Sequence, residues 1–264
     1  MKKGLGQLES RALAYTQMRG LDRLRQGDLV AALGLTPSQE RELFSRLARA
    51  RLIARVRRGL YLVPPRLPLG GEWTPDEATA LNALIEDKDG RYQICGPGAF
   101  RRYGFDDQVA DRVYAYNNRI SGDRKVGAVR LTLIKVADSR LGATEEVRTP
   151  DGQAVVYSSR ARTLVDAVYD WSRFGTLPRA FEWAATELAA GRVSPAELVR
   201  TILAYGNQGT IRRMGVLLEH EGVRQPLLKK LLSALRSSRS LITWVPDRPR
   251  RGKTDKKWGV VVNA

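Results

Sequence analysis

Three arginines, Arg55, Arg57 and Arg58, surround a tight turn in the stretch LIARVRRGLYLVP at residues 52–64. Two short apolar runs flank the turn, which predicts a β-hairpin with a positively charged tip. Because neighbouring like charges repel one another, we expect these side chains to contribute little to the fold. Guanidinium groups match the geometry of phosphate oxygens and guanine edges, so the chemistry expected of this tip is contact with a polyanion.

The residues just before the hairpin predict a helix with a polar outer face. In TPSQERELFSRLARARL, Thr36, Pro37 and Gln39 are typical of a capping box with proline in the first turn. The apolar residues fall on one side of this helix, and the polar residues fall on the other. Together with the hairpin, this polar face gives the candidate DNA-contacting residues, which are Ser38, Gln39, Arg41, Glu42, Ser45, Arg46, Arg49, Arg55, Arg57, Arg58 and Tyr61.

The elements that position these residues follow a recognisable order. A first helix is predicted at 8–20, and a short second helix, which Asp28 can cap, precedes the turn at Gly34. The third helix and the hairpin complete the order that is typical of a winged helix-turn-helix. In that fold the third helix enters the major groove of DNA, and the hairpin, or wing, contacts the backbone or the minor groove. We expect such a domain over residues 1–70.

The net charge of +17 is concentrated at the two ends of the 264-residue chain. Residues 1–70 hold 14 basic and 5 acidic side chains, residues 71–223 hold 20 and 21, and residues 224–264 hold 11 and 2. Arginine outnumbers lysine by 35 to 10, which suits phosphate contact but also arises in GC-rich genomes. Codon composition does not explain the segregation of charge, which favours a nucleic-acid partner.

Other chemistries have little support in the sequence. One cysteine, Cys95, and one histidine, His220, leave no zinc ligand set and no nucleophile–histidine triad, so we expect no metal and no cofactor. The segment Gly96-Pro97-Gly98 lacks the residues of a nucleotide-binding loop and predicts a plain turn. Asp166 and Asp170, four residues apart on a predicted helix, could hold Mg²⁺, but pairing of one of them with Arg162 is the stronger expectation.

The chain has the composition of a globular protein. It is 43% hydrophobic, it has no run of eighteen uncharged apolar residues, and its N-terminus lacks the apolar segment of a secretory signal. We therefore expect a cytoplasmic protein without a membrane partner.

The remainder, residues 71–264, predicts a larger mixed α/β domain after a Pro- and Gly-rich linker at 64–73. A helix at 74–85 leads into apolar strand-like runs, with Pro150-Asp151-Gly152 as a hairpin turn, so we expect a mostly antiparallel sheet. Helices then follow at 159–171, 177–190, 195–205, 207–221 and 226–237, and two short strands flank a basic loop at the end. The fold class expected for the whole chain is α+β.

Three segments in this order resemble the AbiEi family, the antitoxins of type IV abortive-infection systems. They are RRGLYLV, SSRARTLVDAVYD and GTIRRMGVLLEHEG, and the similarity extends from residue 8 to about 245. The resemblance implies a transcriptional repressor that binds its own operator through the winged helix. It also implies a C-terminal domain that neutralises a cognate nucleotidyltransferase-like toxin in phage defence.

The resemblance also places the antitoxin contacts on particular helices. It assigns Arg160, Arg162 and Asp166 to one arginine-bearing helix, and Arg212 and Arg213 to another. The basic segment 248–257 matches no motif of the family, and its residues Arg250, Arg251 and Lys253 are added as candidates from their charge alone.

Two other classes of function remain open from the sequence. A nuclease or nucleotidyltransferase with a winged-helix targeting module would need a cluster of carboxylates for divalent metal, and no such cluster is evident. A transcription factor whose C-terminal domain senses a small molecule would need an apolar pocket, which leaves no sequence signature. We therefore expect a binding protein and not an enzyme.

Overall fold

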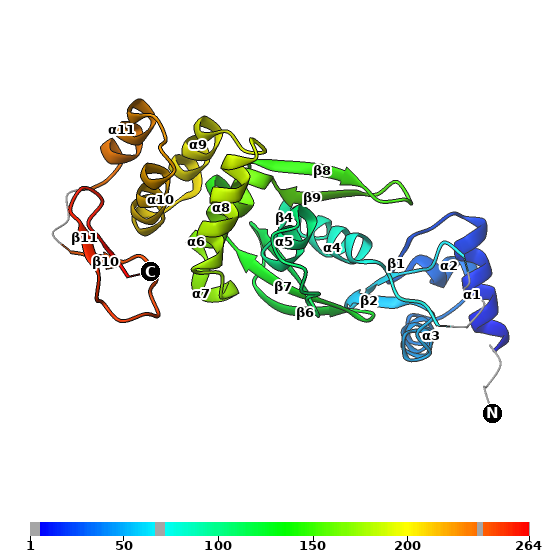
Figure 1. The fold of residues 1–264 in the computed structure, drawn as a ribbon. Coiled ribbons are helices and arrows are strands. Elements are labelled where there is room, and N and C mark those ends of the chain that lie inside the picture. The colour runs from blue at the N-terminus through cyan, green and yellow to red at the C-terminus, as the bar shows by residue number, and fades with distance from the viewer. Residues whose placement is uncertain (1–5, 67–71, 237–239, 264) are drawn as a thin grey trace.

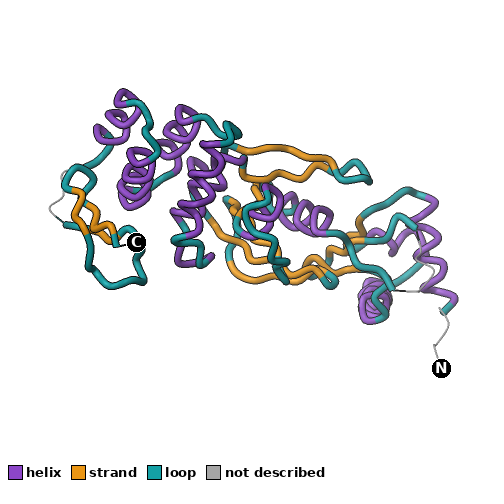
Figure 2. The backbone as a smooth tube through the Cα atoms, in the orientation of Figure 1, coloured by secondary structure: helices purple, strands orange, loops and turns teal. Residues whose placement is uncertain are grey.

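The computed structural model describes residues 6–66, 72–236 and 240–263. The molecule is elongated, with the N-terminal helices at one end, a six-stranded sheet in the middle and a helical layer at the other end (Figure 1). Strands are concentrated in the middle of the molecule, and helices lie toward both ends (Figure 2). Residues 67–71 of the predicted linker lie outside the described residues. Among the described residues, no helix is long and apolar enough to span a bilayer.

The N-terminal part alternates helices with short strands. Its elements are α1 (Gln7–Met18), β1 (Arg23–Arg25), α2 (Asp28–Leu33), α3 (Pro37–Arg49), β2 (Ala54–Arg57) and β3 (Leu60–Leu62). The strands form an antiparallel sheet in the order β1-β3-β2, so β2 is an edge strand. The three helices and the hairpin lie where the sequence predicts them. The three-residue strand β1 was not predicted.

Local capping fixes the start of α3. The Thr36 hydroxyl accepts a hydrogen bond from the Gln39 amide, and the Gln39 side chain accepts one from the Thr36 amide, which is the predicted capping box. The start of α2 differs from the prediction, because the buried carboxylate of Glu40 accepts hydrogen bonds from the Gly27 and Leu29 amides. A side chain of α3 thus caps α2 and sets the angle between the two helices.

The middle part contains a mixed six-stranded sheet in the order β6-β7-β5-β4-β9-β8. The sheet is mostly antiparallel, as expected: the pairings β6–β7, β5–β4 and β9–β8 are antiparallel, whereas β5 pairs with β7 and β4 pairs with β9 in parallel. The elements are α4 (Glu77–Glu86), β4 (Tyr92–Cys95), α5 (Pro97–Tyr103), β5 (Val113–Asn117), β6 (Gly122–Val126), β7 (Val129–Lys135), η1 (Asp138–Arg140), β8 (Thr144–Arg148) and β9 (Ala154–Ser158). The edge strand β6 was not predicted, because its sequence GDRKV is polar and lacks the apolar pattern of a strand.

Helices and a small sheet form the C-terminal end. They are α6 (Arg160–Tyr169), α7 (Trp171–Phe174), α8 (Arg179–Ala189), α9 (Pro195–Tyr205), α10 (Gln208–His220), α11 (Gln225–Ser233), β10 (Ile242–Thr243), β11 (Lys253–Asp255) and β12 (Val260–Val262). Trp258 packs into the helical core beside Gly215, so the last strands cover α10. Asn207 caps α10, its side chain accepting a hydrogen bond from the Thr210 amide.

The N-terminal sheet packs on both of its faces. Tyr61 and Leu24 belong to the core formed by α1 and α3, whereas Ala54 and Leu62 belong to the core formed by α4 and the six-stranded sheet. The predicted wing is therefore not a free-standing hairpin. Its rear face is buried against α4, which fixes the N-terminal helices relative to the middle sheet.

Candidate nucleic-acid interface

An open groove lies between α3 and the β2–β3 hairpin. We call it the α3 groove; its volume is about 580 Å³, and it is lined by Gln26, Arg41, Phe44, Ser45, Ala48, Arg49, Arg55, Arg58, Gly59 and Tyr61. The rings of Phe44 and Tyr61 lie 4.8 Å apart at its base and belong to the core beneath. The helical face and the hairpin thus present their arginines to one concave surface.

The arginines of this groove lack acidic partners. Arg41, Arg49, Arg55 and Arg58 are all exposed, and in the described part of the chain none of them forms a salt bridge. The one side-chain contact among them is a hydrogen bond from Arg49 Nε to the carbonyl of Ser45 at 3.3 Å. Four uncompensated guanidinium groups on one concave surface create a strongly positive local potential.

Three of the predicted contact residues of α3, namely Gln39, Glu42 and Arg46, have partners within the protein. Arg46 donates to Glu9 at 2.7 Å and to Glu42 at 3.3 Å, which joins α3 to α1. The side chain of Gln39 is used in the capping box. Ser38 and Ser45 are exposed, as predicted for the outer face. Arg46 is thus engaged in ion pairs within the protein, and its contact with base edges stays a prediction.

The hairpin also departs from expectation at two positions. Arg57 forms a bidentate ion pair with Asp87, with Nε to Oδ2 at 2.7 Å and Nη2 to Oδ1 at 2.6 Å. The hydrogen bond from Arg57 holds the pKa of Asp87 below its ordinary value. Tyr61 is 9% exposed, and its ring packs on Phe44 in the core at the base of the α3 groove. Of the predicted wing residues, Arg55 and Arg58 remain available to a ligand.

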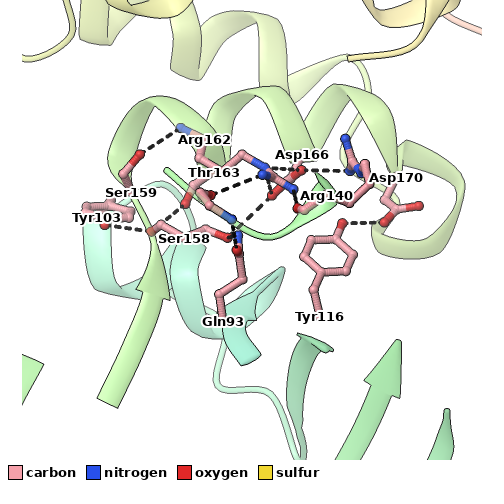
Figure 3. Close-up of polar contacts among 11 residues, drawn as sticks. Gln93, Tyr103, Tyr116, Arg140, Ser158, Ser159, Arg162, Thr163, Asp166 and Asp170 are labelled. Carbon is pink, nitrogen blue, oxygen red and sulfur yellow. Dashed lines mark hydrogen bonds and ion pairs between the residues drawn. The ribbon is translucent and has the colours of Figure 1, made fainter. Parts of the chain in front are cut away.

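The SRARTLVD helix carries a buried polar cluster instead of an interaction surface (Figure 3). The Arg162 side chain is fully buried, and its Nε donates to both carboxylate oxygens of Asp166 at 2.8 Å. Its remaining nitrogens donate to the carbonyls of Gly142 and Arg140, and the guanidinium stacks on the Tyr205 ring at 3.9 Å. Arg162 and Asp166 are therefore buried and paired with each other, and neither side chain is exposed to a partner.

Further hydrogen bonds connect this cluster to the sheet. Ser158 Oγ donates to Asp166 at 3.4 Å and accepts from Gln93 Nε2 at 2.8 Å. Burial raises the pKa of Asp166 above its ordinary value, although Arg162 and Arg140 oppose that shift. Because charges removed from water need such partners, the network fixes α6 against β4, β9 and the loop after η1.

Asp170 has a separate role from Asp166. Its carboxylate accepts a hydrogen bond from the Tyr116 hydroxyl, whose pKa is raised well above its ordinary value by burial. Of the two aspartates, Asp166 is therefore the partner of Arg162, which confirms the expectation that one of them pairs with this arginine. In the described ranges, no three His, Cys, Asp or Glu side chains are grouped in a way that could hold a metal ion.

Arg212 and Arg213, on the second helix that the resemblance assigns to toxin contact, also form hydrogen bonds within the protein. Arg212 donates to the carbonyls of Trp258 and Ser240, and Arg213 donates to those of Thr243 and Trp244. Both residues are half-buried, and they hold the C-terminal strands on α10. Burial accordingly lowers the pKa of both groups.

The remaining candidates for toxin contact are Arg160 and the residues of the C-terminal basic segment. Arg160 pairs with Glu187 at 2.8 Å and lies over the Tyr103 ring at 4.8 Å, so it is mainly structural. Arg250, Arg251 and Lys253 are exposed, with Arg250 bonded to the carbonyl of Leu241. Among the residues assigned to toxin contact, these last three are exposed, whereas Arg160, Arg212 and Arg213 are half-buried.

Comparison with known proteins gives the fold and no family. The sequence matches no family model and no curated protein. In structure the chain is similar to the RV2827C protein of Mycobacterium tuberculosis, with a TM-score of 0.62 and 15% identity over 98% of this chain and 92% of that one. At this identity the similarity concerns the arrangement of the elements alone.

Proposed function

We propose that the N-terminal part is a winged helix-turn-helix that binds duplex DNA. The observation that carries the proposal is the α3 groove, where Arg41, Arg49, Arg55 and Arg58 present four charges without acidic partners. The element order α1-β1-α2-α3-β2-β3 and the capping of α2 by Glu40 support it, because they hold α3 at an angle to α2 beside a hairpin.

In this proposal the parts of the groove have different tasks. Arg41 and Arg49, on the outer face of α3, contact base edges in the major groove, where arginine pairs with guanine. Arg55 and Arg58, on the hairpin, contact phosphates, which position the protein without selecting a sequence. Arg57 holds the hairpin in place from behind through Asp87.

At the level of biology, we propose a repressor of its own operon that is also the antitoxin of a type IV-like system. The resemblance of three segments to the AbiEi family supports this step. Two of these segments form α6 and α10, whose arginines serve the fold, so toxin contact falls to exposed residues such as Arg250, Arg251 and Lys253. The protein acts by binding and has no catalytic turnover in this proposal.

Fluorescence anisotropy with two labelled duplexes of equal length tests the DNA-binding proposal. One duplex carries the sequence upstream of the gene, and the other carries the same bases in scrambled order. We expect preferential binding of the upstream duplex and a strong dependence of affinity on salt. Equal weak binding of both duplexes, with little salt dependence, would contradict the proposal.

Growth rescue tests the antitoxin step separately. The adjacent gene, expressed alone, is expected to arrest growth, and co-expression of this protein is expected to restore it. An Arg250→Ala/Arg251→Ala/Lys253→Ala variant should rescue less well than one with Arg41→Ala and Arg49→Ala. Identical rescue by both variants would remove the C-terminal residues from toxin contact.

A further inference from the structure

A second basic hollow lies beside the α3 groove, between two edge strands. It has a volume of about 900 Å³ and is bounded by the end of α3, by β2, by residues 72–74 and by the turn between β6 and β7. We call it the β2–β6 cleft, because β2 is the edge of the N-terminal sheet and β6 is the edge of the middle sheet. Both hollows are lined by Ala48, Arg49 and Arg55, so they form one continuous surface.

The cleft contains more positive charge than its acidic groups neutralise. Of its arginines, Arg51 pairs with Glu72 at 3.1 Å and Arg57 pairs with Asp87. Within the described residues, Arg49, Arg55 and Lys125 have no ionic partner. Lys125 is exposed and belongs to β6, so the middle part of the chain contributes one charge to this surface.

The packing beneath the cleft fixes Lys125 relative to α3. Val126, the next residue, is fully buried in the core that also contains Ala54 of β2. At Gly127, where φ is +61°, a β-carbon would lie 2.9 Å from Pro75 Cδ and 3.4 Å from Ala54 Cβ. The turn is therefore packed against the start of β2, so the backbone that carries Lys125 is held in a fixed position beside the cleft.

We propose that the β2–β6 cleft binds the phosphate backbone of the same duplex whose major groove α3 enters, with Lys125 as a contact from the second domain. This inference rests on the proposed DNA-binding function and extends the contact surface from Arg58 through Arg55 and Arg49 to Lys125. A row of cations along one concave surface fits the regular charges of a DNA strand. The contact strengthens binding without selecting sequence.

The test compares Lys125→Ala with Lys135→Ala in the full-length protein, using the upstream and scrambled duplexes. Lys135 is exposed and lies at the opposite end of β7 from the turn, so both variants lose one equivalent charge from the same sheet. Anisotropy titrations at several salt concentrations give the slope of log K against log salt. Lys125→Ala should reduce the steepness of that slope by about 0.9, which corresponds to one phosphate contact, for both duplexes.

The expected result is an unchanged slope in Lys135→Ala, a wild-type slope in Lys125→Arg, and an unchanged preference for the upstream duplex in all variants. If Lys125→Ala and Lys135→Ala give the same slope while the wild-type protein binds, the cleft is not a DNA contact and the proposed function stands. If the wild-type protein binds neither duplex, the proposed function and this inference are both overturned.

Discussion

Arg57, at the end of β2, and Asp87, just after α4, form a bidentate ion pair in which the Asp87 side chain is 3% exposed and that of Arg57 is 42% exposed. The pair joins the hairpin to the middle part of the chain across thirty positions of sequence. An arginine that the sequence suggests for phosphate contact thus fixes the orientation of the neighbouring residues that we propose contact DNA.

The first prediction concerns the stability that this pair provides. Asp87→Asn should lower the free energy of unfolding at pH 7 by about 1.5–3 kcal/mol, the range for a hydrogen bond to a charged group. The folded pKa of Asp87 lies below its unfolded value, so its contribution is present above the unfolded pKa and is lost as pH falls through the folded pKa. Urea unfolding of both proteins at pH 7 and near pH 3 should show a difference that shrinks in acid. A constant difference would mean that Asp87 ionisation is not responsible.

The second prediction separates the two neighbouring arginines of the turn. Arg58→Ala should reduce the steepness of the salt slope by about 0.9, because Arg58 is exposed and has no ionic partner among the described residues. Arg57→Ala should leave the slope nearly unchanged and instead lower the melting temperature. Salt titrations beside thermal melts measure both effects, and the reverse assignment would show that Arg57 exchanges Asp87 for phosphate.

The third prediction concerns the buried cluster. Arg162→Ala should destabilise the protein by about 3–5 kcal/mol, because it leaves the buried Asp166 carboxylate without its main partner. The double variant Arg162→Met/Asp166→Leu should lose less stability than this single variant. Chemical denaturation of the two variants provides the comparison. Near wild-type stability of Arg162→Ala, together with failed growth rescue, would instead restore Arg162 as a toxin contact.

The fourth prediction concerns the C-terminal strands. A β-carbon at Gly215 would overlap the indole ring of Trp258, so Gly215→Ala should cost about 1–3 kcal/mol. It should also expose residues 240–263 to limited proteolysis. Combining Gly215→Ala with Trp258→Leu relieves the overlap. The double variant should therefore lose less stability than the sum of the losses in the two single variants. Full additivity would indicate that the helix tolerates alanine by moving away from Trp258.

Features set by neighbours in sequence were predictable, and features set by distant contacts were not. The Thr36–Gln39 capping box and the turn at residues 150–152 depend on a few adjacent residues, so their side-chain types sufficed. Strands β1 and β6 are short and rich in charged residues, and only pairing with β3 and β7 makes them strands.

The same distinction explains the errors at the candidate site. Nothing near Arg57 in the sequence indicates Asp87, and the periodicity of α6 alone does not place Arg162 inside the core. One signal was available: Asp166 stands within the apolar run LVDAVY, four residues after Arg162, a spacing that suits a pair on one helical face. The exposed arginines of α3 were predictable because amphipathic periodicity places them opposite its apolar residues.

A comparison of two triple variants tests the proposal that the α3 groove binds DNA. One variant carries Arg41→Ala, Arg49→Ala and Arg55→Ala; the control carries Arg101→Ala, Arg200→Ala and Arg224→Ala, which remove three exposed charges elsewhere. The measurement is the affinity of each for the upstream and scrambled duplexes at one salt concentration. We expect the groove variant to lose at least about tenfold in affinity for the upstream duplex and most of its preference for that duplex, while the control retains both. Equal losses in the two variants would contradict the proposal, since binding would then depend on total charge and not on this groove.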